Sequence, residues 1–272
     1  MKTLYVSDLD GTLLNHEGKL SQTTIEIIKD VVSKGGLFSF ATARSYQTSH
    51  KITQALDVNI PIIVYNGTFV MNQQTKEIII GNFFNDDIKE VIRNLFHHGI
   101  SMLVYHIIDG VEYFSFLKDQ ESEGMKKFLS TRLNDPRWRE VQGLDELLKG
   151  DIFYINCIDE KEKLWSFYEK YQNNYHCLYE ADIYTKAHMF EIMPQHVSKA
   201  SAILQLKDFL HCDHVICFGD GKNDLDMFKV ADEAYAVRNA CEELKALATD
   251  VIGSNDEDSV AKFIQKRFLQ KQ

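Results

Sequence analysis

The chain has 272 residues, of which 44% are hydrophobic and 26% charged, and its formal net charge is −10. That length is about twice a typical single domain, enough for a buried core and a second module. The negative charge argues against a nucleic-acid-binding protein, for which a basic surface is expected, and no apolar run approaches the roughly 18 residues of a membrane helix. The five cysteines are odd in number and form no Cys-x-x-Cys pair, so we expect reduced thiols and a cytoplasmic location.

The first predicted strand delivers two aspartates to a glycine turn. An apolar run is followed by Asp8, Leu9, Asp10 and Gly11. Side chains at positions i and i+2 leave an extended segment on the same side, so Asp8 and Asp10 can address one small ligand. Two carboxylates this close repel each other unless a cation or a shared proton intervenes, which suggests a metal-bound nucleophile at Asp8 and a proton shuttle at Asp10. The competing interpretation is an ordinary strand ending in an Asx/Gly turn.

A helix is predicted over residues 21–34, followed by a second apolar strand that ends at the hydroxyl of Thr42. Ala43 and Arg44 come next, and another helix is expected after them. A hydroxyl and backbone N–H groups at a strand-to-helix junction form a ready anion site. An ordinary N-cap threonine is the simpler alternative.

The middle of the chain, from about residue 82 to 186, lacks such motifs and changes in pattern. It predicts an open α+β module with helices at 86–98, 121–133 and 160–171 and strands at 101–106, 111–116, 152–158 and 175–179. We expect short hinges near 81–85 and 184–189, because no long linker composition is present.

The last third of the chain adds a lysine and two more aspartates. Lys199 opens a predicted helix and can neutralise both a phosphoryl group and the Asp8 carboxylate, although most such lysines are solvated. A further apolar strand runs into a glycine-rich turn with Asp220 and Asp224, which suit Mg2+ because that cation takes oxygen donors. A calcium loop of the EF-hand type is the competitor, but the long apolar strand and the missing glutamate at the end of the loop argue against it.

Strands and helices alternate at both ends of the chain, which calls for a parallel sheet covered on both faces. Ligands of such sheets bind beyond the carboxyl ends of the strands. Asp8, Thr42 and Asp220 all follow predicted strands directly. The sequence therefore predicts that they converge on one edge of the sheet.

In order along the chain, Asp-x-Asp-Gly-Thr, a strand-end Thr, a helix-start Lys and Gly-Asp-Gly-x-Asn-Asp closely resemble the four motifs of the haloacid dehalogenase-like (HAD) superfamily. The chain looks more narrowly like its Cof-like branch, which carries a large type IIB cap and has an Asn-Gly pair where Tyr65-Asn66-Gly67-Thr68 stands here. The resemblance implies an α/β fold, with a Rossmann-like parallel-sheet catalytic core in residues 1–82 and 188–272. An α+β cap inserted at 83–187 would set substrate specificity.

The resemblance also implies roles for single residues. Asp8 would be the nucleophile and a Mg2+ ligand, and Asp10 the general acid/base, which also binds Mg2+ through its backbone carbonyl. Asp220 and Asp224 would complete the metal shell. Arg44 would steer the anionic part of the substrate, and the remaining phosphate-binding positions would be the backbone of Leu9 with Thr42, Ala43, Lys199 and Asn223. The family commonly has glycine where Ala43 and Ala200 stand, and we expect the added methyl groups to crowd the site only slightly.

The implied function is that of a Mg2+-dependent phosphatase acting through an aspartyl-phosphate intermediate on small phosphate monoesters. Sugar phosphates and cofactor phosphates such as flavin mononucleotide or pyridoxal phosphate are the expected substrates. A sugar phosphomutase of the same superfamily and a non-catalytic regulator that binds phosphorylated metabolites are the alternatives. We expect a small phosphorylated metabolite as partner, neither nucleic acid nor membrane, and a monomer or weak homodimer.

Overall fold

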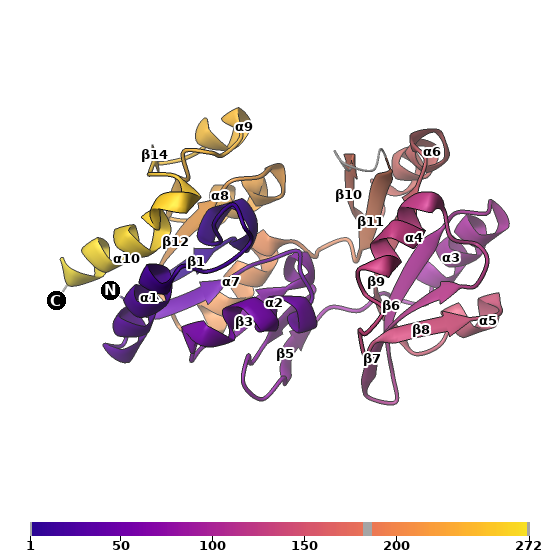
Figure 1. Cartoon of the computed structure of the whole chain (residues 1–272), viewed down its shortest axis with the longest axis horizontal. Helices are drawn as coiled ribbons and strands as arrows, with labels where there is room; N and C mark the ends of the chain where they lie inside the picture. The colour runs from indigo at the N-terminus through magenta and orange to yellow at the C-terminus, as the bar shows by residue number, and fades with distance from the viewer. Residues whose placement is uncertain (1, 182–186, 271–272) are drawn as a thin grey trace. The chain divides into compact units, whose positions relative to one another are not determined.

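The computed structural model describes residues 2–181 and 187–270, and the chain forms two compact units (Figure 1). Unit 1 combines Met1–Gly81 with Val197–Gln272, and unit 2 is Asn82–His196. An insertion of this kind was predicted. Among the described residues, the helices are all too short or too polar to cross a membrane.

Unit 1 is built on a parallel sheet of five strands in the order β14-β13-β12-β1-β2. The interior strand β1 pairs in parallel with β12 on one side and with β2 on the other. Its apolar side chains are buried, which is expected of a strand covered on both faces. This confirms the predicted fold class. The strand bounds are Thr3–Ser7 (β1), Leu37–Phe40 (β2), His214–Gly219 (β12), Glu233–Ala236 (β13) and Asp250–Val251 (β14).

Serine hydroxyls cap the first turns of several helices of unit 1. The Ser21 hydroxyl accepts the Thr24 N–H at 2.9 Å and starts α1, which packs along α10 (Figure 1). The helix bounds are Gln22–Ser33 (α1), Tyr46–Thr53 (α2), Lys199–Phe209 (α7), Leu225–Val230 (α8), Glu242–Lys245 (α9) and Ser259–Leu269 (α10). Short helical turns lie at Leu9–Leu13 (η1), Gln54–Leu56 (η2), Tyr65–Gly67 (η3), Lys222–Asp224 (η4) and Asn255–Glu257 (η5).

A small antiparallel sheet extends unit 1 beyond β2. It consists of β3 (Ile62–Val64), β4 (Phe69–Met71) and β5 (Ile78–Gly81), and a single parallel bridge joins Ala41 to Ile63. The sequence pattern did not predict this sheet. It matters for the site because η3 connects β3 to β4.

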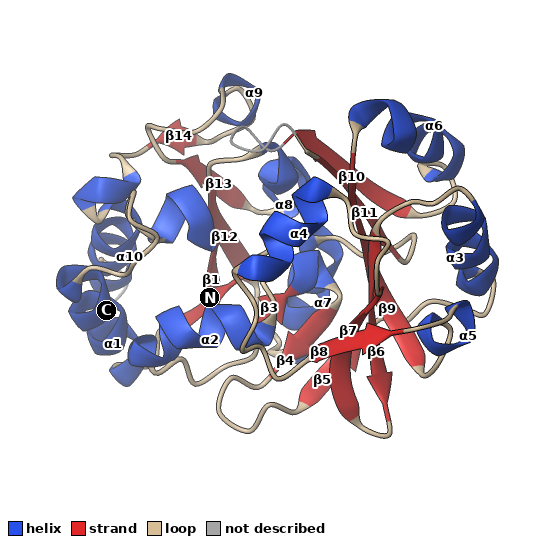
Figure 2. Cartoon of the chain, turned by 45° about the vertical axis from the view of Figure 1, so that its right-hand side comes forward, coloured by secondary structure: helices blue, strands red, loops and turns tan. Residues whose placement is uncertain are grey.

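Unit 2 contains a six-stranded sheet in the order β10-β11-β9-β6-β7-β8, antiparallel except for the β7–β8 pair. Figure 2 shows α3, α5 and α6 on one side of this sheet and α4 on the other. The predicted elements of this region are present, whereas β8, α5 and the last strand β11 were not predicted. The bounds are Met102–Ile108 (β6), Val111–Leu117 (β7), Trp138–Val141 (β8), Asp151–Asp159 (β9), His176–Ala181 (β10), His188–Met193 (β11), Ile88–His97 (α3), Glu123–Ser130 (α4), Leu144–Leu147 (α5) and Lys161–Tyr171 (α6).

The second boundary between the units differs from the predicted one. The sequence assigned residues from 188 onward to the core, but β11 pairs with β10 on one edge and with β9 on the other. Because the hydrogen bonds of both edges hold β11 in the sheet of unit 2, unit 1 resumes only at Val197. The first hinge, expected near 81–85, agrees with the boundary after Gly81. Part of the hinge expected near 184–189 lies outside the described residues.

Candidate active site

Three side chains from distant segments meet at the carboxyl end of β1. Asp8 follows β1, Lys199 opens α7 and Asp224 ends η4, and all three are buried. The Lys199 Nζ atom donates to Asp8 Oδ1 at 2.5 Å and to Asp224 Oδ1 at 2.7 Å. Burying charged side chains costs free energy, and apolar side chains could fill the same space without that cost. A buried ammonium between two carboxylates therefore marks this cluster as a candidate functional site.

The local structure fixes the lysine of this cluster. The hydroxyl of Ser198 accepts the Ser201 N–H at 3.1 Å, and the Ser201 hydroxyl accepts the Ser198 N–H at 3.0 Å. This reciprocal cap defines the first turn of α7, from which Lys199 projects.

Asp224 is held by backbone groups as well as by the lysine. Its Oδ2 atom accepts the N–H groups of Asp220 at 3.0 Å and Gly221 at 3.1 Å. Since Oδ1 already accepts from Lys199, both oxygens of Asp224 are engaged. The geometry therefore favours Asp224 as the residue that orients Lys199.

Asp220 lies beside the loop that follows β1. Its Oδ1 atom accepts the Thr12 hydroxyl at 3.0 Å. Gly11 has a φ of +76°, and a Cβ atom there would overlap Asp220 Oδ2. Only glycine adopts this positive φ without strain and also lacks the Cβ atom that would overlap Asp220. The glycine of the first motif therefore lets η1 pack directly on the Asp220 carboxylate.

The acidic cluster has the donors of a hard-cation site. Asp8, Asp220 and Asp224 each offer a carboxylate oxygen, and these oxygens lie within 4.8 Å of one another. Burial raises the pKa of Asp8 well above its usual range against the opposing effect of Lys199. Burial, followed by the charge of Asp224, also raises the pKa of Asp220 to about 6. Three carboxylates, two of which bind the Lys199 ammonium, would bind a divalent cation favourably, and oxygen donors of this kind fit Mg2+.

Lys199 keeps its charge in this environment. Burial alone would lower its pKa, but the carboxylates of Asp224 and Asp8 outweigh burial and raise the pKa above its ordinary value. The site therefore contains a permanent positive charge adjoining the expected nucleophile, and such a charge stabilises a phosphoryl group.

Asp10 binds a different partner from Asp8. Strand β1 ends at Ser7, and Asp10 lies in η1, where its carboxylate faces Arg44. The Arg44 Nε atom donates to Asp10 Oδ2 at 2.7 Å, and Nη2 donates to Oδ1 at 2.6 Å. Strand β1 ends before both aspartates, and their carboxylates bind different partners, Lys199 and Arg44; that both side chains leave on the same side stays a prediction. The Asp10 side chain is 52% exposed, so it has room to reorient.

The expected phosphate-binding residues follow the ends of neighbouring strands. Thr42 is buried after β2, where its hydroxyl accepts the Arg44 N–H at 3.1 Å. Leu9 is buried after β1, Ala43 is exposed, and Asn223 is partly exposed in η4. The structure thus places these residues at the edge predicted for them, while their roles stay predictions.

Two asparagines from the last third of the chain hold the loop after β1, and the sequence analysis assigned no role to either. Asn239 donates its Nδ2 to the Gly11 carbonyl at 2.8 Å, and Asn255 donates its Nδ2 to the Leu14 carbonyl at 2.9 Å. The Asn255 N–H donates in turn to Asn239 Oδ1 at 3.1 Å. Single asparagines in turns form no spacing pattern, so sequence reasoning missed their positions.

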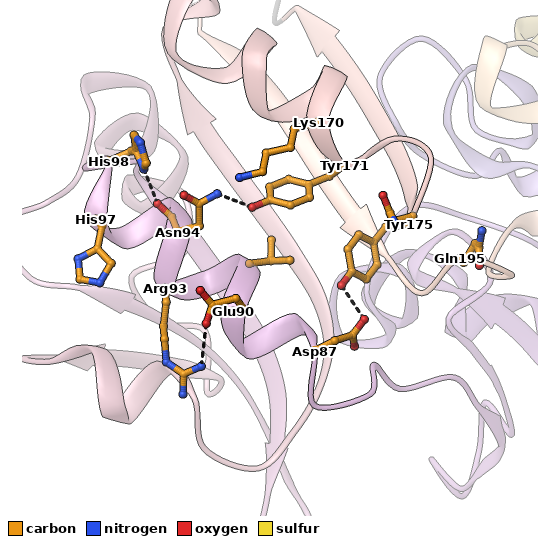
Figure 3. Close-up of a pocket in the computed structure, with 12 residues that line it drawn as sticks. Asp87, Glu90, Arg93, Asn94, His97, His98, Lys170, Tyr171, Tyr175 and Gln195 are labelled. Carbon is orange, nitrogen blue, oxygen red and sulfur yellow. Dashed lines mark hydrogen bonds and ion pairs between the residues drawn. The ribbon is translucent and has the colours of Figure 1, made fainter.

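Unit 2 contains a hollow of about 870 Å3 between α3 and the end of α6 (Figure 3). Its polar groups mostly bind one another: Tyr175 donates to Asp87 at 2.9 Å and Asn94 donates to Tyr171 at 2.5 Å. Most of its lining residues are exposed. The hollow therefore lacks the buried, converging polar groups that mark the cluster around Asp8.

Comparisons with known proteins agree with this geometry. The model of the haloacid dehalogenase-like hydrolase family matches residues 5–264. A chloroplastic endoribonuclease YBEY of Arabidopsis thaliana is 27% identical over 95% of this chain, which spans only 45% of that protein. A 5-amino-6-(5-phospho-D-ribitylamino)uracil phosphatase of Bacillus subtilis is 26% identical over 97% of both chains. The crystal structure of a haloacid dehalogenase-like hydrolase from Bacteroides thetaiotaomicron, 24% identical, superposes with a TM-score of 0.80 over 98% of this chain and 100% of that one, which shows the shared fold.

Proposed function

Because the chain belongs to the haloacid dehalogenase-like hydrolase family, we propose that it is a Mg2+-dependent phosphatase of small phosphate monoesters. The observation that carries this proposal is the buried Lys199 ammonium between Asp8 and Asp224 at the carboxyl end of β1. The Bacillus subtilis relative is named as a phosphatase of a small phosphorylated compound, which supports the same reaction class.

In the proposed reaction, a carboxylate oxygen of Asp8 attacks phosphorus while the bond from phosphorus to the leaving oxygen breaks. Asp10 gives its proton to the departing alcohol. In the second step a water oxygen attacks the phosphorus of the aspartyl phosphate and loses a proton to Asp10, which releases phosphate and restores Asp8. Lys199 stabilises the negative charge on the transferring group, so catalysis consists mainly of positioning and electrostatics.

The remaining phosphate contacts would come from the strand ends. The Thr42 hydroxyl, the backbone N–H groups of Leu9 and Ala43, and the Asn223 side chain are the donors that we assign to the phosphoryl oxygens. Their positions after β1, β2 and β12 support this assignment. Three adjacent strand ends provide the concave, donor-rich edge that anionic ligands require.

Arg44 and Asp10 must separate during this reaction. In the structure the guanidinium binds both oxygens of Asp10. For Asp10 to protonate a leaving group, its carboxyl must turn away from Arg44, which then becomes available to the anionic part of the substrate. We therefore propose that substrate binding exchanges the partners of these two residues.

Mg2+, when bound, would neutralise charge on the phosphoryl oxygens. Asp8 and Asp220 are the carboxylates that we expect to hold it, with the Asp10 carbonyl as a further donor. Asp224 contributes to the acidic cluster, but its oxygens already accept from Lys199 and from two backbone N–H groups. We accordingly assign Asp224 mainly to orienting the lysine.

We further propose that unit 2 selects the substrate among sugar phosphates and cofactor phosphates such as flavin mononucleotide or pyridoxal phosphate. Unit 2 is inserted into the sequence of the catalytic unit, which supports a role in substrate choice. The cytoplasmic location and the state of monomer or weak homodimer stay predictions.

The test measures phosphate release from p-nitrophenyl phosphate and from a panel of sugar and cofactor phosphates, with Mg2+ and with EDTA. Asp8→Asn should abolish release without unfolding the chain. Asp30→Asn, which changes an exposed carboxylate on α1, is the matched control and should leave turnover unchanged. Metal-independent release, or full activity of Asp8→Asn, would contradict the proposal. An isomerised sugar phosphate without free phosphate would identify a phosphomutase.

A further inference from the structure

The turn η3 holds an unusual backbone conformation. Tyr65 and Asn66 both have a φ of +52°, and Gly67 follows with a φ of +103°. A left-handed conformation costs a residue with a side chain roughly 1–2 kcal/mol, and such strain gathers at functional sites. Two such residues in succession need strong contacts to hold them in place.

One set of contacts ties the turn to the segment that carries Thr42. The Asn66 N–H donates to the Thr42 carbonyl at 2.9 Å, and the Tyr65 N–H donates to the Arg44 carbonyl at 3.0 Å. The two strained residues therefore bind both ends of the Thr42–Arg44 segment.

Another contact ties the turn to the start of α7. A Cβ atom at Gly67 would overlap the Ser198 carbonyl oxygen and would lie 3.1 Å from the Lys199 nitrogen. The backbone of the turn thus rests directly on the backbone that carries Lys199. As a result, η3 sets the separation between the Thr42 hydroxyl and the Lys199 ammonium, which come from segments more than 150 positions apart in the sequence.

The Asn66 side chain is the second unusual feature. Only 3% of this residue is exposed, and neither Oδ1 nor Nδ2 has a hydrogen-bond partner among the described residues. A buried polar group without a partner costs about 1–3 kcal/mol, and such groups in native proteins call for a specific explanation. An asparagine kept only for its left-handed backbone could be replaced by glycine without this cost.

We propose that Asn66 is a positioning residue of the phosphoryl site. When a phosphoryl oxyanion is bound, the carboxamide forms the hydrogen bonds that it lacks here with the groups around that anion, and so keeps the Thr42 segment and Lys199 at the spacing that this tetrahedral ligand needs. Asparagine meets both demands of the position, because it tolerates the left-handed region and brings a donor and an acceptor. This inference rests on the proposed function.

The experiment compares two replacements of Asn66 with a control at a similar backbone angle. Asn66→Gly keeps the left-handed backbone and removes the carboxamide. Asn66→Asp keeps the shape but replaces the NH2 donor by an oxygen. Asp57→Gly makes the same backbone change at an exposed residue with a φ of +53°. For each variant we would measure kcat, KM, inhibition by inorganic phosphate and urea unfolding.

Asn66→Gly should lower kcat/KM by about 10–100-fold and raise the inhibition constant of inorganic phosphate severalfold, because supporting hydrogen bonds and placement within about 1 Å carry effects of this size. Asp57→Gly should change neither quantity. Asn66→Asp should lose activity at neutral pH and regain part of it as the pH falls, since a protonated carboxyl again offers a donor.

The proposal is overturned if Asn66→Gly lowers the unfolding midpoint but keeps wild-type kcat/KM and phosphate inhibition, because the carboxamide would then be only structural. If that variant does not fold, a folded Asn66→Asp with wild-type activity at every pH overturns it equally. Failure of the proposed function is a separate result, in which the wild-type chain itself releases no phosphate. In that case, calorimetric titration with inorganic phosphate still compares binding by Asn66→Gly and wild type, and equal affinities overturn the proposal.

Discussion

The two units bury their polar side chains in different ways. In unit 1 the buried Lys199 joins Asp8 and Asp224, which lie 191 and 25 positions away in the sequence. In unit 2 the buried Arg137 joins Asp135, two positions away, and Glu112, 25 positions away. The Lys199 cluster therefore joins segments from both ends of the sequence, whereas Arg137 joins its own turn to the neighbouring strand β7.

Unit 2 also contains buried groups whose neutral forms are favoured, whereas the charged Lys199 of unit 1 lies between two carboxylates. His106 in β6 is buried against the Lys149 carbonyl and the Ser115 hydroxyl, and burial lowers its pKa to about 4. Burial raises the pKa of Glu191 in β11 to about 7. A buried group that becomes neutral avoids most of the desolvation cost, so these side chains suit a structural role. The contrast places charge-dependent chemistry in unit 1.

The largest effect is expected from Lys199→Met. Without the ammonium, the Asp8 and Asp224 carboxylates face each other in a buried site, which should lower the free energy of unfolding by about 3–5 kcal/mol. Loss of the charge that stabilises the phosphoryl group should lower kcat by at least about 10²–10³-fold. Urea unfolding and phosphate release measure the two losses.

The double variant Lys199→Met with Asp224→Asn separates the loss of stability from the loss of activity. Removing one of the unpaired carboxylates should restore part of the stability without restoring activity, because neither change returns the cation. If the double variant regained turnover as well, the lysine would act only through folding, and the contrast between the units would fail.

Glu191→Gln tests whether the buried Glu191 of unit 2 is neutral in the folded chain. The folded-state pKa of Glu191 is raised by burial from 4.5 to about 7, so folding favours the protonated carboxyl. The free energy of unfolding of the wild-type chain should therefore fall by about 3 kcal/mol as the pH rises from about 4.5 to 7, and stay constant above pH 7. This size follows from about 1.4 kcal/mol per pKa unit. The glutamine variant lacks this loss, and urea unfolding across the pH range would show it as the more stable protein above pH 7.

Glu169→Gln serves as the control for that titration, because Glu169 is an exposed carboxylate on α6. Its unfolding curve should follow the wild type at every pH. If the stability of the wild type did not fall between pH 4.5 and 7 relative to Glu191→Gln, Glu191 would be solvated in the folded chain. Glu191 would then no longer be a buried neutral group of unit 2.

Gly11→Ala is expected to have a smaller effect, confined to unit 1. The new methyl group would displace the Asp220 carboxylate, so the Mg2+ concentration for half-maximal activity should rise about 10-fold, as for other changes that support metal ligands. Gly18→Ala is the matched control, since Gly18 has a φ of +70° and open space around its Cα. An equal Mg2+ requirement in both variants would show that only the backbone angle matters.

The sequence predicted unit 1 well because its motifs sit where parallel strands end. Asp8, Thr42 and Asp220 were expected at one edge from strand order alone, and the structure places them there. Periodicity could not show that the chain leaves β1 before Asp10, since a one-turn helix inside a glycine motif has no repeat of its own. The partner of Asp10 was therefore missed.

The boundary at the end of unit 2 could not be predicted from the local sequence pattern. The segment of β11 contains Glu191-Ile192-Met193, which reads equally well as a strand of either sheet. Its membership is decided by pairing with β9 and β10, and pairing over long range is not encoded in local pattern. The left-handed turn at Asn66 escaped notice for a related reason, because its contacts to Thr42 and Ser198 arise only in the folded chain.

The smallest predicted effects, from the loss of two helix N-caps, test whether the two units unfold separately. Ser21 caps α1 in unit 1 and Ser122 caps α4 in unit 2, where its hydroxyl accepts the Met125 N–H at 3.0 Å. Replacing either serine by alanine should cost about 1 kcal/mol, the usual contribution of an N-cap. Since each unit has its own sheet and core, we expect Ser21→Ala to lower one calorimetric transition and Ser122→Ala another. Equal shifts of a single transition would show instead that the two units unfold together, and the different polar clusters of the units would then not correspond to separate stabilities.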